Sequence, residues 1–335
     1  MNDNIVLSVR DLEVNFYNNE RCNRVLRGVS FQLQKGKIMC IVGESGCGKS
    51  VTANSIMGLL PDLSRIEKGE IHFFHNGRDI RIDQLKRKGK EMRQIRGDGI
   101  SMIFQDSMTS LNPVLTIGRQ LEETISVHSS LSKDEIKKQA LDILTKVGVS
   151  SPEQRLKEFP HQLSGGMRQR VMIAMALSCS PSLLIADEPT TALDVTIQAQ
   201  IIDLMVELKK NINASIILIT HDMGVVAEMA DYIMVMYAGK VMEYGSARQI
   251  FKEAMHPYTQ GLLASIPRLD KDLDRLFSID GTVPSLDRMP KGCRFCARCL
   301  QAMDKCREHQ PPVYITDDGH KVSCWKYENL KEEKV

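Results

Sequence analysis

The chain has 335 residues, of which 42% are hydrophobic and 26% are charged, an ordinary composition for a globular protein with one large or two modest domains. Its formal net charge of +2 gives no electrostatic reason to expect a nucleic-acid binder. The start Met1-Asn2-Asp3-Asn4 is unlike a signal peptide, and no apolar run approaches the roughly 18–20 residues of a membrane helix, so we expect any membrane association to go through a partner subunit.

Short apolar runs alternate with helical patterns along most of the chain. Strands are predicted at 5–9, 30–33, 38–42, 100–104, 183–186, 215–220 and 232–237. Helices are predicted at 49–60, 167–177 and 195–210, and a capping box at Ser132 and Glu135 opens another that runs to about Val147. This alternation predicts an α/β fold with a largely parallel sheet and helices on both faces. Beyond about residue 255 the alternation stops, and we expect a separate unit rich in prolines and cysteines.

The segment Gly43-Glu44-Ser45-Gly46-Cys47-Gly48-Lys49-Ser50 follows a predicted strand and opens a predicted helix. It fits G-x-x-x-x-G-K-[ST], the pattern of a phosphate-binding loop, in which backbone N–H groups and the helix N-terminus surround the phosphates. Lys49 is expected to reach the β- and γ-phosphates of ATP, and Ser50 to ligate Mg²⁺. Because such a loop binds through its backbone, the Cys47 thiol is expected to face away from the phosphates.

Two carboxylates follow the apolar run at 183–186. Asp187 suits the Mg²⁺ shell, and Glu188, which the end of the strand frees to turn toward the nucleotide, suits a general base that orients the attacking water. Without the phosphate loop, a solvated acidic strand end would be an equally good interpretation.

Leu163-Ser164-Gly165-Gly166-Met167 precedes a predicted helix and offers a second anion site, built from a serine and two glycine N–H groups. One nucleotide does not need two such clamps, so the second is expected to serve the ATP of a facing subunit. Standing alone, this segment would be interpreted as an ordinary glycine-rich helix start.

In their order along the chain, the motifs resemble those of the ATPase subunits of ABC transporters over roughly residues 5–255, although that family usually has Gln where Met167 stands. The resemblance implies a P-loop NTPase core at 1–255 with an inserted helical subdomain at about 106–175, followed by a small cysteine-rich extension at 256–335. It also implies that Gln105 contacts Mg²⁺ and water, that Ala192-Leu193-Asp194 contacts a partner subunit, and that His221 touches the γ-phosphate. Phe16 is expected to stack on adenine, with Tyr17 as the alternative.

The candidate catalytic residues are therefore Glu188, His221 and Gln105, and the candidate Mg²⁺ ligands are Ser50, Gln105 and Asp187. The residues expected to contact a nucleotide are Phe16, Gly43, Ser45, Gly46, Cys47, Gly48, Lys49, Ser50, Val51, Gln105, Asp187, Ser164, Gly165, Gly166 and Asp194.

A narrower resemblance is to the ATPases of dipeptide and oligopeptide importers. It rests on the phosphate loop, on Phe104-Gln105-Asp106 with Ser110-Leu111-Asn112-Pro113, on Pro189-Thr190-Thr191-Ala192-Leu193-Asp194-Val195-Thr196, and on His256-Pro257-Tyr258-Thr259. This resemblance implies ATP-driven peptide uptake at the cytoplasmic face of the cell membrane. The implied partners are a second ABC ATPase, in a heterodimer rather than a homodimer, two transmembrane permeases and an extracytoplasmic substrate-binding protein, with no nucleic acid.

Three alternatives stay open from the sequence. Nickel importers share the narrower features. A non-transport ABC ATPase of DNA repair or translation would be expected to carry a long coiled coil between Lys49 and Ser164 or a second ATPase domain, and neither is present. A regulatory P-loop protein without turnover would not need Glu188 and His221.

Five of the nine cysteines fall within a segment at 290–327, namely Cys293, Cys296, Cys299, Cys306 and Cys324. We expect a reducing compartment, which disfavours disulfides, and a metal commonly stabilises a small segment of low apolar content. The spacing of Cys293, Cys299, Cys306 and Cys324 resembles the end of dipeptide importer ATPases, some of which hold a [4Fe–4S] cluster, and this implies a cluster here. Cys296 is extra by that pattern and creates a ferredoxin-like Cys-x₂-Cys-x₂-Cys run. Structural Zn²⁺ is the main alternative, and free thiols are the other.

Overall fold

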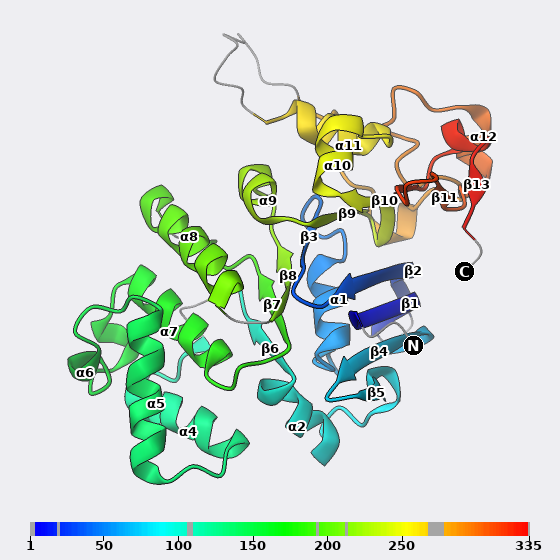
Figure 1. The fold of residues 1–335 in the computed structure, drawn as a ribbon. Coiled ribbons are helices and arrows are strands. Elements are labelled where there is room, and N and C mark those ends of the chain that lie inside the picture. The colour runs from blue at the N-terminus through cyan, green and yellow to red at the C-terminus, as the bar shows by residue number, and fades with distance from the viewer. Residues whose placement is uncertain are drawn as a thin grey trace. The chain divides into compact units, whose positions relative to one another are not determined.

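The computed structural model describes residues 4–18, 21–105, 110–191, 194–211, 214–266 and 278–333. These residues form two compact units. The first contains the chain up to Val6, Leu33–Lys37 and Phe73–Ile219, and the second contains Leu7–Gln32, Ile38–His72 and the chain from Thr220 onward. Figure 1 colours both from blue at the N-terminus to red at the C-terminus.

Three parallel strands form the sheet of the first unit. Strand β7 (Leu183–Asp187) pairs with β6 (Ile100–Ile103) on one side and with β8 (Ser215–Ile219) on the other. Every residue of β7 and β8 is buried, as expected for parallel strands covered on both faces. The short hairpin strand β5 (Arg78–Arg81) and helix α2 (Lys90–Asp98) precede β6.

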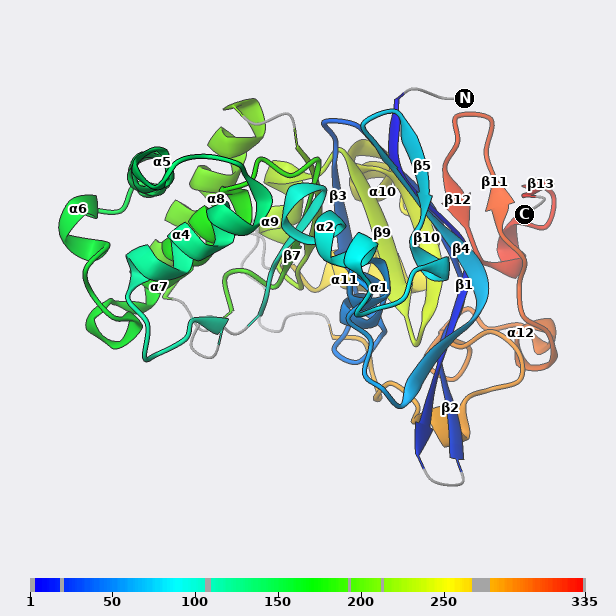
Figure 2. The same ribbon diagram turned by 90° about the horizontal axis from the view of Figure 1, so that it is seen from below.

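The helices between β6 and β7 gather into a group of their own (Figure 2). They are α4 (Ile117–His128), α5 (Lys133–Lys146), α6 (Pro152–Arg155) and α7 (Gly165–Leu177), and α8 (Val195–Asn211) follows β7. The predicted capping box is confirmed, because the Ser132 hydroxyl accepts from the Glu135 N–H while the Glu135 carboxylate accepts from the Ser132 N–H.

The second unit contains two sheets. In one, β3 (Ile38–Val42) runs parallel to β9 (Tyr232–Tyr237), which pairs antiparallel with β10 (Lys240–Ser246). In the other, β1 (Ile5–Asn18) lies between β2 (Arg21–Gln34) and β4 (Ser64–His75). Helix α1 (Lys49–Ile56) follows β3, and α9 (Met223–Met229) precedes β9.

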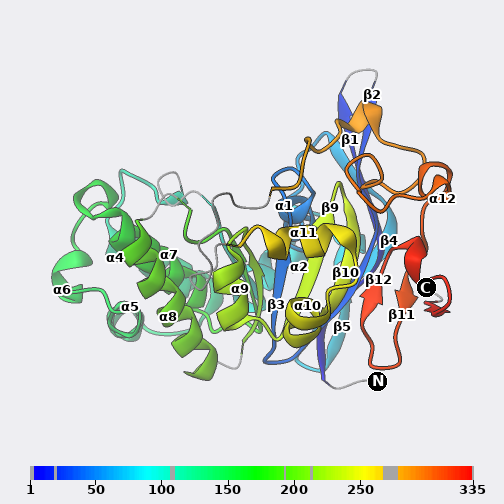
Figure 3. The same cartoon turned by 90° about the horizontal axis from the view of Figure 1, so that it is seen from above.

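The C-terminal part of the chain extends the sheet of β9 and β10. Helices α10 (Ala247–Glu253) and α11 (Pro257–Ala264) contact β10 (Figure 3), and the short helix α12 (Asp304–Glu308) follows later. Strand β12 (Lys321–Val322) pairs with β10, and β11 (Tyr314–Ile315) and β13 (Lys331–Glu332) continue outward.

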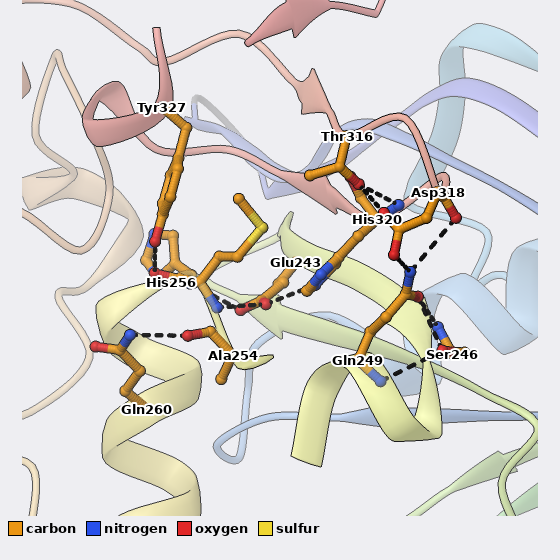
Figure 4. Close-up of polar contacts among 11 residues, drawn as sticks. Glu243, Ser246, Gln249, Ala254, His256, Gln260, Thr316, Asp318, His320 and Tyr327 are labelled. Carbon is orange, nitrogen blue, oxygen red and sulfur yellow. Dashed lines mark hydrogen bonds and ion pairs between the residues drawn. The ribbon is translucent and has the colours of Figure 1, made fainter. Parts of the chain in front are cut away.

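A buried polar cluster fastens this C-terminal part to β10 (Figure 4). The Glu243 carboxylate lies 2.8 Å from His320 Nε2 and accepts from the backbone N–H groups of Met255 and His256 at 2.7 and 2.9 Å. Glu243 and His320 are both almost fully buried. Residues 278–333 therefore lie in the same compact unit as β10. The domain boundary predicted near residue 255 stays a prediction. Strands β11, β12 and β13, which join the tail to this sheet, are only two residues long each, too short for a periodic pattern in the sequence to reveal them.

Element lengths also differ from expectation at two places. Strands β1 and β2 run for 14 residues each, well beyond the predicted 5–9 and 30–33. Helix α1 ends at Ile56 rather than near residue 60. Just after this end, Gly58 adopts a left-handed φ of 60°, as glycines at helix C-termini commonly do. In the described ranges no helix is both long and apolar enough to cross a membrane.

Candidate functional site

The phosphate loop joins β3 to α1 in the second unit. Gly43, Gly46 and Gly48 have φ values of 149°, 75° and 101°, which favour glycine. A Cβ at Gly43 would lie 2.1 Å from the Met236 carbonyl oxygen, whereas one at Gly46 would meet no atom within 4 Å. The N-cap of α1 is Gly48, which has no side chain to cap the helix, and the first turn carries no acidic residue. The loop thus presents a helix N-terminus suited to an anion.

Lys49 lies over this loop. Its side chain is buried, and Nζ donates to the carbonyl oxygens of Gly43 at 2.8 Å and Glu44 at 3.1 Å. Buried carbonyl dipoles therefore hold the ammonium beside the loop, where its charge would face a bound phosphate.

Cys47 is fully buried. Its carbonyl accepts from the Gly239 N–H at 2.8 Å, and burial raises the pKa of its thiol. A buried, protonated thiol is a poor nucleophile, which agrees with an incidental role for this side chain.

A residue of the cysteine-rich segment contacts the phosphate loop directly, and sequence analysis missed it. Arg298 donates to the Glu44 carboxylate at 2.7 Å, to the Tyr237 hydroxyl at 3.4 Å, and to the carbonyls of Ile279 and Asp280. The Glu44 N–H in turn donates to the Tyr258 hydroxyl at 3.0 Å. Tyr258 belongs to the quoted His-Pro-Tyr-Thr motif, but no sequence pattern marks Arg298.

In the first unit, Glu188 leaves strand β7 as expected. Asp187 is the last, buried residue of the strand, and Glu188 has a left-handed φ of 45°. The Glu188 carboxylate accepts from the Gln105 side-chain amide at 2.8 Å and from the Thr191 hydroxyl at 3.0 Å. Gln105 and Glu188 are thus brought together, and they are joined by Thr191, which the sequence analysis quoted within a motif but gave no role.

The second predicted anion site lies at the start of α7. Ser164 is its N-cap and accepts from the Met167 N–H at 3.3 Å. A Cβ at Gly166 would lie 2.7 Å from Ile197 of α8, so close packing requires glycine there. Asp194 caps α8, because its side chain accepts from the Ile197 N–H at 2.9 Å. This gives Asp194 a structural role alongside any contact with a partner.

The two aromatic candidates at the end of β1 differ in their surroundings. The Tyr17 hydroxyl donates to Glu67, and the Arg65 guanidinium lies 5.4 Å from the centre of its ring. Phe16 is half-buried, and neither of these two contacts involves it.

The predicted γ-phosphate contact, His221, also lies in the second unit. It is exposed and immediately precedes Asp222, which caps α9.

The five tail cysteines line one small cavity of about 10 Å³. Burial raises the pKa of the Cys293 thiol to about 12 and also raises the pKa values of Cys296, Cys299 and Cys324. In the part of the chain that the structure describes, no three His, Cys, Asp or Glu side chains converge as a single metal ion would require.

Of the motif residues quoted from the sequence, Asp106, Ala192 and Leu193 lie outside the described residues.

Comparison with known protein families finds one match in the ATPase part of the chain and another toward its C-terminus. The ABC transporter family model matches residues 26–191, and the model for the oligopeptide/dipeptide transporter C-terminal region matches residues 242–306. The dipeptide transport ATP-binding protein DppD of Bacillus subtilis (strain 168) is 52% identical over 98% of this chain and 97% of its own length. The oligopeptide transport ATP-binding protein OppD of Salmonella typhimurium is 48% identical over 96% of this chain and 94% of its own.

Among solved structures, a dimeric post-hydrolysis state of the ATP-binding cassette MJ0796 bound to ADP and Pi is 28% identical, with a TM-score of 0.63. The structural match covers 72% of this chain and 99% of the MJ0796 chain. This likeness supports a P-loop fold of mixed α and β elements. The chain therefore belongs to the ABC transporter family of ATPases, in its oligopeptide/dipeptide branch.

Proposed function

We propose that this ATPase energises the import of dipeptides or oligopeptides across the cytoplasmic membrane. The observation that carries the proposal is similarity over almost the whole chain, tail included, to ATP-binding proteins named for dipeptide and oligopeptide transport. By the same analogy, two membrane permeases, a second ABC ATPase in a heterodimer and an extracytoplasmic substrate-binding protein would complete the transporter, and the ATPase would lie at the cytoplasmic face.

The residues of the phosphate loop would bind ATP. Gly43, Ser45, Gly46, Cys47, Gly48 and Val51 would surround the phosphates through the backbone, and Lys49 would neutralise the β- and γ-phosphates. Phe16 would stack on adenine in preference to Tyr17, because Tyr17 already contacts Arg65 and Glu67. Mg²⁺ would supply charge neutralisation at the phosphates, and the oxygens of Ser50, Asp187 and Gln105 suit a hard cation that prefers such ligands.

Hydrolysis would depend on Glu188. Its carboxylate accepts hydrogen bonds from Gln105 and Thr191, and it would accept a proton from the attacking water. His221 would contact the γ-phosphate. Ser164, Gly165, Gly166 and Asp194 would act on the nucleotide or surface of the facing ATPase, so that ATP binding closes the dimer and hydrolysis reopens it.

The tail cysteines would hold a [4Fe–4S] cluster through Cys293, Cys299, Cys306 and Cys324. Support comes from the single small cavity that these cysteines line together. Structural Zn²⁺ is the alternative, because four thiolates also suit a closed zinc site; zinc sites more often use two closely spaced cysteine pairs, and Cys306 and Cys324 are not paired in this way. Iron and sulfide assays on anaerobically purified protein test this, and one zinc per chain without iron would favour the alternative. Cys296→Ser, which removes the extra cysteine, should retain full iron content.

Uptake by the reconstituted transporter tests the main proposal. The chain, its permeases and its partner ATPase are placed in proteoliposomes with the binding protein, and labelled dipeptides, longer peptides and Ni²⁺ are compared. Peptide uptake that requires ATP and is lost in Glu188→Gln is expected. Nickel uptake without peptide uptake would identify the nickel importer instead, and ATPase activity without transport of either would point to a non-transport ATPase.

A further inference from the structure

A cavity of about 390 Å³ in the second unit has no part in the site described above. Strands β1 and β2, the start of β10 and residues 286–310 of the tail line it. The lining includes no residue of the phosphate loop and neither Phe16 nor Tyr17. Its volume is that of a pocket for a small molecule.

The charges around this cavity are strongly unbalanced. Five cations line it, namely Arg24, Arg27, Lys240, Lys291 and Arg294, against two carboxylates, Asp11 and Glu13. The Asp11 carboxylate already pairs with Lys68 at 2.5 Å, and Glu13 lies 4.0 Å from Arg27. Among the described residues, neither Lys240 nor Arg294 forms an ion pair. Among the described residues, cations therefore outnumber carboxylates around this cavity by five to two.

Of these cations, Arg294 is withdrawn from water and Lys240 is half-buried. Arg294 is 7% exposed, and one of its guanidinium nitrogens donates to the Ala238 carbonyl oxygen. Burial lowers the pKa of Lys240, and the nearby charges of Arg294 and Arg27 lower it further. Holding buried like charges together opposes folding unless a counter-charge is supplied. Ordinary surface lysines and arginines avoid this cost by extending into solvent.

We propose that this cavity is a binding site for a small polyanion that carries at least two phosphate or carboxylate groups. The Arg294 guanidinium presents a planar set of donors suited to such oxygens, and Lys240 adds a compact positive charge beside it. Because the tail residues 286–310 form one wall, the bound anion bridges the tail to strands β1 and β2.

Inorganic pyrophosphate and citrate serve as probes of the two anion chemistries. The full-length chain is used with Lys49→Ala, which removes the phosphate-loop contribution, and binding is measured by calorimetry and by the midpoint of thermal unfolding. At about 100 times its Kd, the better probe should raise the midpoint by roughly 3–5 °C. Adding Lys240→Met should weaken binding by about tenfold or more and abolish the shift. Without a probe, the same change should leave the midpoint unchanged or raise it, because a buried repulsion is removed.

Lys252→Met, which removes an equal charge from an exposed position on α10, is the matched control and should leave probe binding unchanged. Equal probe affinity with and without Lys240→Met, or no binding of either probe in the Lys49→Ala background, would overturn the proposal. Vesicles of phosphatidylcholine with one-third phosphatidylglycerol test a lipid source of the phosphate. Lys240-dependent binding to these vesicles without binding of the free anions would assign the site to the membrane surface instead of a soluble ligand.

Discussion

Glu188 is placed by two features of its own backbone and side chain. Its left-handed φ turns it out of β7, and Gln105 and Thr191 fix the carboxylate through hydrogen bonds at 2.8 and 3.0 Å. In Glu188→Gln the shape is retained but the base is lost, so ATP should still bind while steady-state hydrolysis falls by about 10²–10⁴. Glu207→Gln, an exposed carboxylate on α8, is the control. A Glu188→Gln variant that hydrolyses ATP at near the normal rate would remove Glu188 from the mechanism.

His256 makes the second unit sensitive to acid. Burial lowers its pKa from 6.5 to about 4, although the charge of Glu243 opposes the shift, and its Nδ1 accepts from the Tyr258 N–H at 3.0 Å. The unfolded chain binds a proton at this residue below pH 6.5 and the folded chain does not. The free energy of unfolding should therefore fall as pH drops from about 6.5 to 4, by up to about 3 kcal/mol. Urea unfolding across this range should show a smaller loss in His256→Asn than in the native chain; equal losses would show that other groups control it.

At the scale of elements, the N-terminus of α7 is the feature assigned to the facing subunit. Ser164→Arg places a bulky cation there, against the helix dipole, and should abolish ATP-driven dimer closure while nucleotide binding by the single subunit persists. Gel filtration with ATP in the Glu188→Gln background, together with the partner ATPase, measures closure.

Loss of a helix cap could itself affect the result, so Ser132→Arg, which removes the cap of α5, is the matched control and should still permit closure. Dimers that still form with Ser164→Arg would contradict a role for α7 across the interface.

The cysteine-rich segment and the phosphate loop are also coupled at this scale. Arg298 has a side chain that is 7% exposed and pairs with Glu44, so Arg298→Met leaves that carboxylate without its cation and loosens the loop. The Kd for ATP should rise by about threefold or more, with a smaller effect on kcat. Arg248→Met, on the exposed face of α10, is the control. An unchanged Kd measured by calorimetry would show that the contact only anchors the tail.

For the whole molecule, the C-terminal part is expected to be required for folding. Deletion of residues 278–335 removes β12 from the edge of β10 and leaves the buried Glu243 without His320. An exposed strand edge and an unpaired buried carboxylate both favour aggregation. The shortened chain should elute as aggregate or unfold at a clearly lower temperature, and a monodisperse chain with the native unfolding midpoint would show that residues up to 277 suffice.

The sequence by itself determined the chemistry that depends on local order. The phosphate loop, the Asp187-Glu188 pair at a strand end and the Ser164 helix start are contiguous patterns, because each uses backbone groups from one turn and its neighbours. Buried strands such as β7 and β8 were likewise predictable, since continuous apolar runs mark strands covered on both faces.

The tertiary structure decided the contacts between residues far apart in the chain. Arg298 with Glu44 and His320 with Glu243 are pairs from distant elements, and the five cations around the 390 Å³ cavity come from β2, β10 and the tail. No spacing rule connects them. Side-chain packing in three dimensions brings these charges together, and sequence patterns report only the local repeat of helix, strand and turn.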